Sequence, residues 1–316
     1  MSSEEFRGIN IVNKAYCTRV VTVDTSRGCT NNCGYCFDQK CNDLRQLTVN
    51  RKGSIRSFHN DQVRDQLRSN TKLKRWLDTY KVVRIGALSD VKMGDEQSYS
   101  ETRGLMQMLW AHGYKYMMVT KSAHSVDRDM LSDFVRHDGM LSVTICYNNV
   151  KHAKLFEDMD MVSIQSRKDL LARAIDMGIK NSLRLNPIHP HYIDSALSMI
   201  DWYKKVGGER IVTELLRVDP RWIPQMKGVD FSDYVTFAKG GFYNGYRTPG
   251  HDLCDKLYMM VTGYAKSIGM NRITICADHL ANKKYGYEPD KVDCCQTTDS
   301  WSVPLPELGS DGYQIV

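Results

Sequence analysis

Short apolar segments rich in β-branched residues alternate along most of the chain with longer segments whose apolar residues recur at helical spacing. The short segments have few polar positions and are typical of strands buried on both faces of a sheet. Six are predicted, at residues 20–25, 82–88, 114–120, 141–147, 182–188 and 210–217. Helices are predicted at residues 61–80, 97–112, 127–137, 167–177 and 193–205, with a short helix also following strand 141–147. Strands separated by helices of about 10–15 residues predict βαβ units and a parallel sheet.

The regular alternation weakens after residue 217. Residues 219–250 are rich in Pro, Gly and aromatic residues and predict a long loop or lid. A helix at 252–268 and a short strand at 272–277 follow, and the tail from His279 is predicted to be irregular. We therefore expect an α/β core domain over residues 1–217 and a C-terminal extension, residues 218–316, packed on it.

Three cysteines, Cys29, Cys33 and Cys36, stand in the segment directly after the first predicted strand. Their spacing, C-x3-C-x2-C, places three thiolates on one loop, whereas iron–sulfur clusters are usually held by four. One iron of such a cluster is left open to bind a group that is not protein. The alternative is a loop that holds zinc, with a fourth ligand from Cys17, Cys41 or a nearby His. That alternative describes a non-catalytic metal-binding or interaction module.

The motif, with the aromatic Tyr35 directly before Cys36, resembles that of the radical S-adenosylmethionine (SAM) superfamily. The resemblance implies a partial (βα)6 TIM-type barrel and a [4Fe-4S] cluster held by Cys29, Cys33 and Cys36. The open iron would bind the amino and carboxylate groups of SAM. Reductive cleavage of SAM, with electrons from flavodoxin or ferredoxin, would give a 5′-deoxyadenosyl radical that abstracts hydrogen from a substrate.

Polar residues on the fourth predicted strand support a cofactor pocket. Side chains alternate along a strand, so Ser142, Thr144 and Cys146 share one face while Val143 and Ile145 share the other. The apolar pair should meet the helices, which turns the other three toward the barrel interior. Polar side chains there need partners, and a bound cofactor would supply them.

Polar residues also stand at the ends of the preceding strands, as Ser89-Asp90 and Thr120-Lys121-Ser122. A buried Lys is costly unless it meets an anion, and the SAM carboxylate is one. These segments, together with residues 166–179 and 184–190, resemble the spore photoproduct lyase-like branch. The resemblance implies SAM contacts from Ser89, Lys121 and Ser142. The full set of cofactor-binding residues that we expect is Tyr35, Ser89, Asp90, Lys121, Ser142, Thr144 and Asn186. Individually, each also fits a strand-end cap or a turn.

One position departs from that branch. Spore photoproduct lyase has a hydrogen-donor Cys directly before the Ser after strand two, and here that position is Leu88. The departure argues against photoproduct repair itself. Cys146 and Tyr147 are the candidate catalytic residues in its place, and the alternative for Cys146 is an inert core thiol.

Four further cysteines lie in the C-terminal extension: Cys254, Cys276, Cys294 and Cys295. Four thiolates can hold an auxiliary Fe–S cluster. The vicinal pair speaks against it, because adjacent side chains diverge in an extended chain. The alternative is a set of structural or solvent-facing thiols.

The distribution of charge bears on the substrate. The net charge of the 316 residues is +6, and the first 80 residues carry the whole excess, mainly from Lys40 to Arg75. Together with the resemblance to the spore photoproduct lyase-like branch and the aromatic residues of the predicted lid, this basic field favours a nucleobase substrate, either in DNA or as a nucleotide. A peptide or small metabolite is the alternative, and a solvated surface is the alternative for the charges. No apolar stretch approaches the ~20 residues that span a bilayer, and the acidic N-terminus is unlike a signal peptide. We therefore expect a cytoplasmic protein without a membrane partner.

Overall fold

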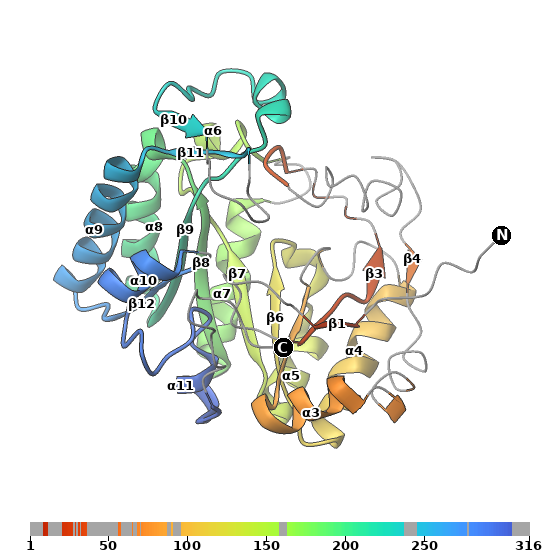
Figure 1. Cartoon of the computed structure of the whole chain (residues 1–316). Helices are drawn as coiled ribbons and strands as arrows, with labels where there is room; N and C mark the ends of the chain where they lie inside the picture. Colours follow the sequence, from red (N-terminus) through yellow and green to blue (C-terminus); the bar gives the residue numbers. More distant parts are fainter. Residues whose placement is uncertain are drawn as a thin grey trace.

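The computed structural model describes most of the chain from residue 71 onward and short segments before it. The described residues are 9–11, 21–27, 29, 31, 33–36, 56–57, 65, 68–69, 71–86, 90, 96–157, 163–236, 245–276 and 278–304. Their elements form an α/β fold built on one large sheet (Figure 1).

The described sheet has eight strands in the order β1-β2-β5-β6-β7-β8-β9-β12. All neighbouring pairs are parallel except β1 with β2. The strands are β1 (Ile9–Ile11), β2 (Val21–Val23), β5 (Val82–Ile85), β6 (Lys115–Thr120), β7 (Met140–Thr144), β8 (Lys180–Ile188), β9 (Arg210–Leu215) and β12 (Arg272–Ile275). The six predicted parallel strands are β2 and β5 to β9, so the predicted partial-barrel α/β fold is confirmed. Two small antiparallel pairs lie beside the sheet: β3 (Ser26–Arg27) with β4 (Arg56–Ser57), and β10 (Tyr234–Thr236) with β11 (Arg247–Pro249).

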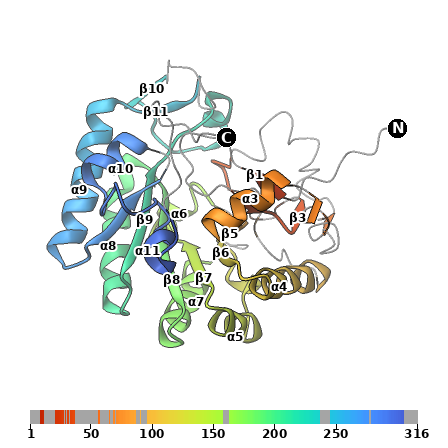
Figure 2. The ribbon, with the colours of Figure 1, turned by 60° about the horizontal axis from the view of Figure 1, so that its bottom comes forward.

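Helices cover the outer side of the curved sheet (Figure 2). They are α3 (Thr71–Tyr80), α4 (Glu96–Ala111), α5 (Arg128–His137), α7 (Ile164–Asp176), α8 (Ile193–Lys205) and α9 (His251–Ser267), with the short α6 (Val150–Ala153) after β7. Local capping explains where some begin and end. The Asp127 side chain accepts the Met130 N–H at 2.9 Å to start α5, and Asp138 ends it in the left-handed conformation.

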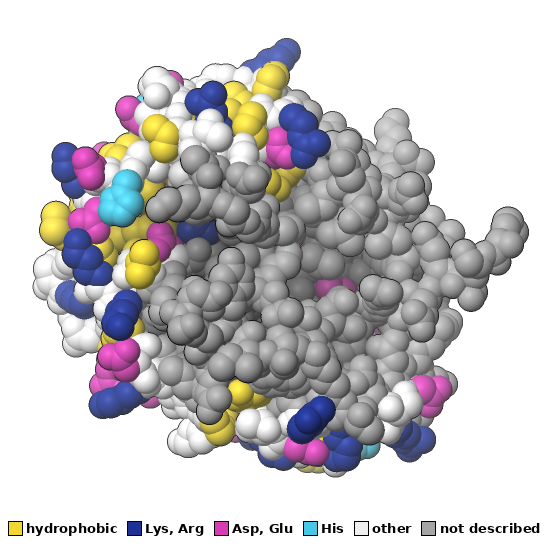
Figure 3. All heavy atoms as spheres, viewed as in Figure 1, with side chains coloured by type: hydrophobic (Ala, Val, Ile, Leu, Met, Phe, Trp, Pro, Cys, Tyr) yellow, Lys and Arg dark blue, Asp and Glu magenta, His cyan; other side chains and the backbone are white. Residues whose placement is uncertain are grey.

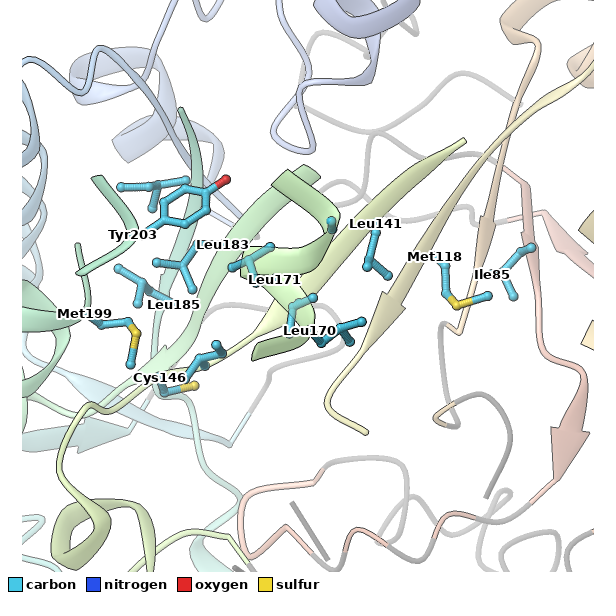
Figure 4. Close-up of a cluster of buried hydrophobic side chains, with 14 of the residues drawn as sticks. Ile85, Met118, Leu141, Cys146, Leu170, Leu171, Leu183, Leu185, Met199 and Tyr203 are labelled. Carbon is cyan, nitrogen blue, oxygen red and sulfur yellow. The ribbon is translucent and has the colours of Figure 1, made fainter. Parts of the chain in front are cut away.

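The main core lies between the sheet and these helices. Alternate residues of β7 and β8 supply Leu141, Leu183 and Leu185, and α7 supplies Leu170 and Leu171. Figure 4 shows these side chains beside Met199 and Tyr203 of α8. Because the apolar positions of β7 take the helix side, Ser142 and Thr144 take the concave side, as predicted.

Several predicted bounds and irregular segments were wrong. Strand 141–147 ends at Thr144, and strand 210–217 ends at Leu215. The tail predicted to be irregular contains α10 (His279–Tyr285) and α11 (Thr297–Trp301), and the predicted lid contains η4 (Pro220–Gln225) and β10–β11. Capping by Asp278 starts α10, and Asp219 caps η4. These elements are too short to be stable on their own or to show a clear apolar period, so capping and tertiary contacts determine them.

The C-terminal extension is built onto the core. Strand β12 pairs in parallel with β9, and the Leu215 N–H donates to the Tyr258 hydroxyl of α9 at 3.3 Å. The predicted short strand thus extends the same sheet. The division of the chain at residue 217 stays a prediction. No helix of the described chain is long and apolar enough to cross a membrane.

Tight packing around Gly139, directly before β7, predicts that a larger residue there destabilises the fold. A Cβ on Gly139 would lie 2.5 Å from Tyr116 Cε2 and 2.9 Å from Phe134 Cδ1, and both rings are fully buried. Gly139→Ala should therefore lower the free energy of unfolding in urea by about 1–3 kcal/mol through overpacking. Gly263→Ala in α9 is the control, because nothing lies within 4 Å of its Cβ position. It should raise stability by up to about 1 kcal/mol. Equal effects of the two substitutions would contradict the packing argument.

Candidate active site

The candidate site lies at the carboxyl ends of the central strands, where the cysteine loop, the β5 and β6 ends and the turn after α6 meet. Asp90 follows β5, Lys121 directly follows β6, and Glu157 follows α6. Two hydrogen-bond networks join these segments to the cysteine loop.

Asp90 ties the cysteine loop to the end of β6. Its buried carboxylate accepts the Thr120 hydroxyl at 2.5 Å, the backbone N–H groups of Lys121 and Ser122 at 2.7 and 3.1 Å, and Asn31 Nδ2 at 2.6 Å. Burial raises the pKa of Asp90, although these donors and the Lys121 charge oppose the rise. Asp90 was predicted to contact SAM. In the structure it holds the loop and the strand end together, and Asn31 is a contact that the sequence reasoning missed.

Lys121, Tyr35 and Glu157 form the second network. Lys121 Nζ donates to the Tyr35 hydroxyl at 2.6 Å and lies 4.5 Å from the centre of the ring. The Tyr35 hydroxyl donates to Glu157 Oε1 at 2.6 Å, and Lys121 Nζ lies 3.9 Å from the same oxygen. Burial lowers the pKa of Lys121, but Cys33 and Glu157 outweigh it and the net shift is upward. Lys121 is therefore a cation held against the cysteine loop, and its contact with SAM stays a prediction.

Arg167 joins this network from α7. Its Nη2 donates to Glu157 Oε2 at 2.8 Å and its Nη1 to the carbonyl of Thr144 at 2.8 Å. Both side chains of the Arg167–Glu157 pair are only 1 % exposed. Burial would raise the pKa of Glu157, but Arg167 and Lys121 lower it below its usual range. Sequence reasoning missed both residues. A charged side chain between the apolar Ile164 and Leu170 was the available signal for Arg167.

The three loop thiols lie close enough to influence one another. Burial raises the pKa of Cys29 and of Cys33, the latter to about 12, and each is raised further by a neighbouring thiol of the loop. The loop is pinned by the Gly34 N–H, which donates to the carbonyl of Phe156 at 2.7 Å. Within the described part of the chain, no three His, Cys, Asp or Glu side chains converge on one metal ion. A three-thiolate cluster site uses one thiolate for each of three irons, so its sulfurs need not converge. The donor set beside Lys121 thus fits a cluster.

The other predicted cofactor contacts have protein partners here. The Ser142 hydroxyl is fully buried and lies 2.7 Å from that of Ser182. Asn186 Nδ2 donates to Glu214 Oε2 at 2.6 Å. Thr144 is bound through its carbonyl by Arg167, and Ser89, with Leu88, lies outside the described residues. Contact of these residues with SAM stays a prediction.

Of the two candidate catalytic residues, Cys146 lies at the network and Tyr147 supports the backbone. Cys146 is buried, and its pKa is raised to about 12, first by burial and then by Glu157, while Lys121 and Arg167 oppose the rise. The Tyr147 hydroxyl donates to the Pro187 carbonyl and accepts the His189 N–H, both at 3.2 Å.

The four cysteines of the extension do not form one site. Cys276, Cys294 and Cys295 belong to one small cluster. Cys254 packs against the main core instead, and its thiol donates to the Pro249 carbonyl at 3.2 Å. The predicted four-thiolate auxiliary site is therefore not formed.

Most of the basic segment from Lys40 to Arg75 lies outside the described residues. At its end, Lys74 pairs with Asp78 at 2.9 Å on the exposed side of α3. On the face shown in Figure 3, described basic and acidic side chains are interspersed.

Comparison with solved structures identifies which known proteins share this fold. No family model matches the sequence, and no curated protein matches it. Among solved structures, a spore photoproduct lyase variant with bound AdoMet and dinucleoside spore photoproduct matches with a TM-score of 0.66. The match has 16% identity and covers 84% of this chain and 78% of the other. The chain has the fold of spore photoproduct lyase.

A second solved structure, Streptococcus suis SuiB bound to S-adenosylmethionine, matches with a TM-score of 0.52 and 12% identity. That match covers 80% of this chain but 49% of SuiB. The part shared with both spore photoproduct lyase and SuiB thus includes most of the chain.

The Arg167–Glu157 pair predicts a pH-dependent stability. Glu157→Gln leaves the Arg167 guanidinium buried without its carboxylate and should cost about 3–5 kcal/mol at pH 7. Because the folded-state pKa of Glu157 is lowered from 4.5, its stabilisation is complete above that value and is lost as pH falls through the folded-state pKa. Urea unfolding at pH 7 and at about pH 3 should show the wild-type advantage shrinking at the lower pH.

Asp169→Asn on the same helix is the control, because Asp169 is exposed and its carboxylate accepts a hydrogen bond from the neighbouring Gln165 side chain at 2.7 Å. It should change stability by less than about 0.5 kcal/mol. A Glu157→Gln effect that stays constant between the two pH values would contradict the charge pairing.

Proposed function

We propose that the chain is a radical SAM enzyme, which cleaves SAM reductively to a 5′-deoxyadenosyl radical that abstracts hydrogen from a substrate. The observation that carries the proposal is the position of Lys121. Its ammonium lies 2.6 Å from the hydroxyl of Tyr35, inside the three-cysteine loop, at the carboxyl ends of parallel strands. Ligands of open α/β sheets bind at these ends. The fold shared with proteins whose structures hold AdoMet supports the same site.

The roles of the chain's own residues follow from their charges and positions. Cys29, Cys33 and Cys36 would hold a [4Fe-4S] cluster, which when bound supplies the electron for SAM cleavage. Lys121 binds the carboxylate of SAM, an anion that suits its buried charge. Tyr35 orients Lys121 through their hydrogen bond. Glu157 and Arg167 are positioning residues, since they act on this pair and on the end of β7.

The substrate that we propose is a nucleobase, in DNA or as a nucleotide. Spore photoproduct lyase, whose fold the chain shares, has been solved with a dinucleoside. Two partly exposed aromatic side chains of the segment after β9, Phe231 and Tyr246, support stacking on a base. Trp222 and Tyr234 of the same segment are buried in the core. We further propose flavodoxin or ferredoxin as the reductant and the cytoplasm as the location, because the cluster requires a reducing compartment.

Cys146 is our proposed hydrogen donor to the product radical. Its pKa of about 12 keeps the thiol protonated at neutral pH, and a donor must carry its hydrogen. The thiol also lies near enough to Lys121, Glu157 and Arg167 for their charges to affect its pKa. This assignment gives the protein a thiol donor two residues after the end of β7.

The first test is the loss of a cluster thiol. Cys33→Ala should abolish 5′-deoxyadenosine formation from SAM under dithionite, because the cluster loses one of three protein ligands. The measurement is chromatography of the products from anaerobically reconstituted protein, with iron content determined in parallel. Cys254→Ala is the matched control and should retain both activity and iron. A colourless protein that binds zinc through the same loop would contradict the proposal.

The second test separates radical formation from hydrogen return. Cys146→Ser should keep 5′-deoxyadenosine formation but lower the yield of hydrogen-quenched product from a nucleotide substrate by at least about tenfold. The physical reason is that an alcohol O–H bond is much harder to break homolytically than a thiol S–H bond. Product and 5′-deoxyadenosine are measured in the same reaction. An unchanged ratio of the two would show that Cys146 is only a core thiol.

A further inference from the structure

The C-terminal tail lies across the concave side of the sheet. Cys294 and Cys295 pack against Met117 of β6 and Met140 of β7. The Thr274 hydroxyl of β12 donates to the Cys294 carbonyl at 2.6 Å. Farther along the tail, the indole N–H of Trp301 donates to the carbonyl of Asp138 at 3.0 Å. The tail thiols are thus held inside the curve of the sheet.

These thiols surround a buried cation, Arg184 of β8. Arg184 is only 2 % exposed. Its guanidinium donates to Cys295 Sγ at 3.7 Å and to Cys276 Sγ at 3.5 Å. Among the described residues, no carboxylate forms an ion pair with Arg184. Glu214 lies near, but its oxygens accept from Asn186 at 2.6 Å and from Arg217 at 3.3 Å. A buried guanidinium requires an anion, and a thiolate is the anion that this arrangement offers.

Hydrogen bonds among the thiols assign their protonation. Cys294 is bonded to both Cys276 and Cys295, which raises the pKa of Cys294. The hydrogen bond from Cys294 is the main cause that lowers the pKa of Cys295 to about 5. The charges of Arg184 and Arg84 lower it further, whereas burial acts in the opposite direction. The interaction of Cys294 with Cys276 likewise lowers the pKa of Cys276. Cys294 is therefore the thiol between two sulfurs with thiolate character.

Access differs among the three. Cys294 and Cys295 are buried, whereas Cys276 is partly exposed. Thiolate character and access together determine which cysteine reacts with an external disulfide. Cys276 has both, and Cys294 is hydrogen-bonded beside it.

We propose that Cys276, Cys294 and Cys295 form a thiol–disulfide exchange site, in which Cys276 and Cys294 join in a reversible disulfide. The oxidant is a small disulfide such as that of glutathione. The site is separate from the cysteine loop of Cys29, Cys33 and Cys36. It does not depend on the proposed function.

The exchange proceeds in two balanced steps. The Cys276 thiolate attacks one sulfur of the external disulfide, which forms a mixed disulfide and releases one thiolate. Cys294 then attacks the Cys276 sulfur, and its proton passes to the Cys295 thiolate. The products are the Cys276–Cys294 disulfide, a second released thiolate and a protonated Cys295. The two protein sulfurs are oxidised and the external disulfide is reduced.

The consequence is a covalent link between the end of β12 and the tail. Oxidation also protonates Cys295 and so removes the anion beside Arg184. Both changes act on the concave side of β8, two residues before Asn186.

The test uses the full-length protein in glutathione buffers of defined ratio, followed by acid quenching, alkylation, trypsin digestion and mass spectrometry. Trypsin cleaves after Arg272, Lys283 and Lys291, which places Cys276 on residues 273–283 and the vicinal pair on residues 292–316. The expected product is a disulfide between these two peptides. Cys254, on residues 248–256, is the internal control and should stay alkylated under the same conditions.

Variants assign the partner within the vicinal pair. Cys294→Ser should block the cross-link and raise the glutathione adduct on Cys276 by about tenfold or more. Cys295→Ser should keep the cross-link but slow its formation by about tenfold, because the proton acceptor is lost.

Three results would overturn the proposal. The first is a cross-link that persists in Cys294→Ser, which would place the bond at Cys295. The second is Cys254 oxidised as readily as Cys276. The third is protection of all three thiols by one equivalent of Zn²⁺ in the wild type, since that would assign a metal site instead.

Discussion

The pairing of buried cations with a limited number of anions is the constraint on which the candidate site depends. Arg167 and Lys121 both approach Glu157, at 2.8 and 3.9 Å, so two positive charges share one carboxylate. Arg167 holds the end of β7 through the Thr144 carbonyl, and Lys121 holds Tyr35 of the cysteine loop. This network therefore fixes the loop to the sheet and holds the Lys121 ammonium beside the loop.

The same constraint operates a second time on the concave side of the sheet. Arg184 is as buried as Arg167, but its hydrogen-bond partners are the sulfurs of Cys276 and Cys295. Since Arg184 pairs with Thr144 in the register of β7 and β8, and Arg167 bonds the carbonyl of Thr144, the two networks meet at one residue. The tail that carries the thiols is thus part of the same charge arrangement as the candidate site.

The sequence predicted the regular part of the molecule. Helix α8 has the predicted bounds, Ile193–Lys205. Local periodicity and alternation determine these features. Glu157 and Arg167 were not predicted, because the Tyr35–Glu157 hydrogen bond joins residues 122 apart in the chain and no local pattern encodes it. Helix α11 was missed for a similar reason: Asp293 accepts the N–H groups of Thr297 and Thr298, both at 2.7 Å, in place of any apolar period.

The thiols of this chain differ in protonation because their surroundings differ in charge and burial. Cys33 and Cys146 are buried beside Glu157, which adds to the effect of burial and raises the pKa of each to about 12. Cys295 is buried beside two arginines and a thiol donor, and its pKa falls to about 5. Metal ligation by Cys33 would therefore release a proton, whereas the surroundings of Cys295 favour its thiolate. The two groups of cysteines thus differ in their preferred protonation, because one lies beside a carboxylate and the other beside guanidinium groups.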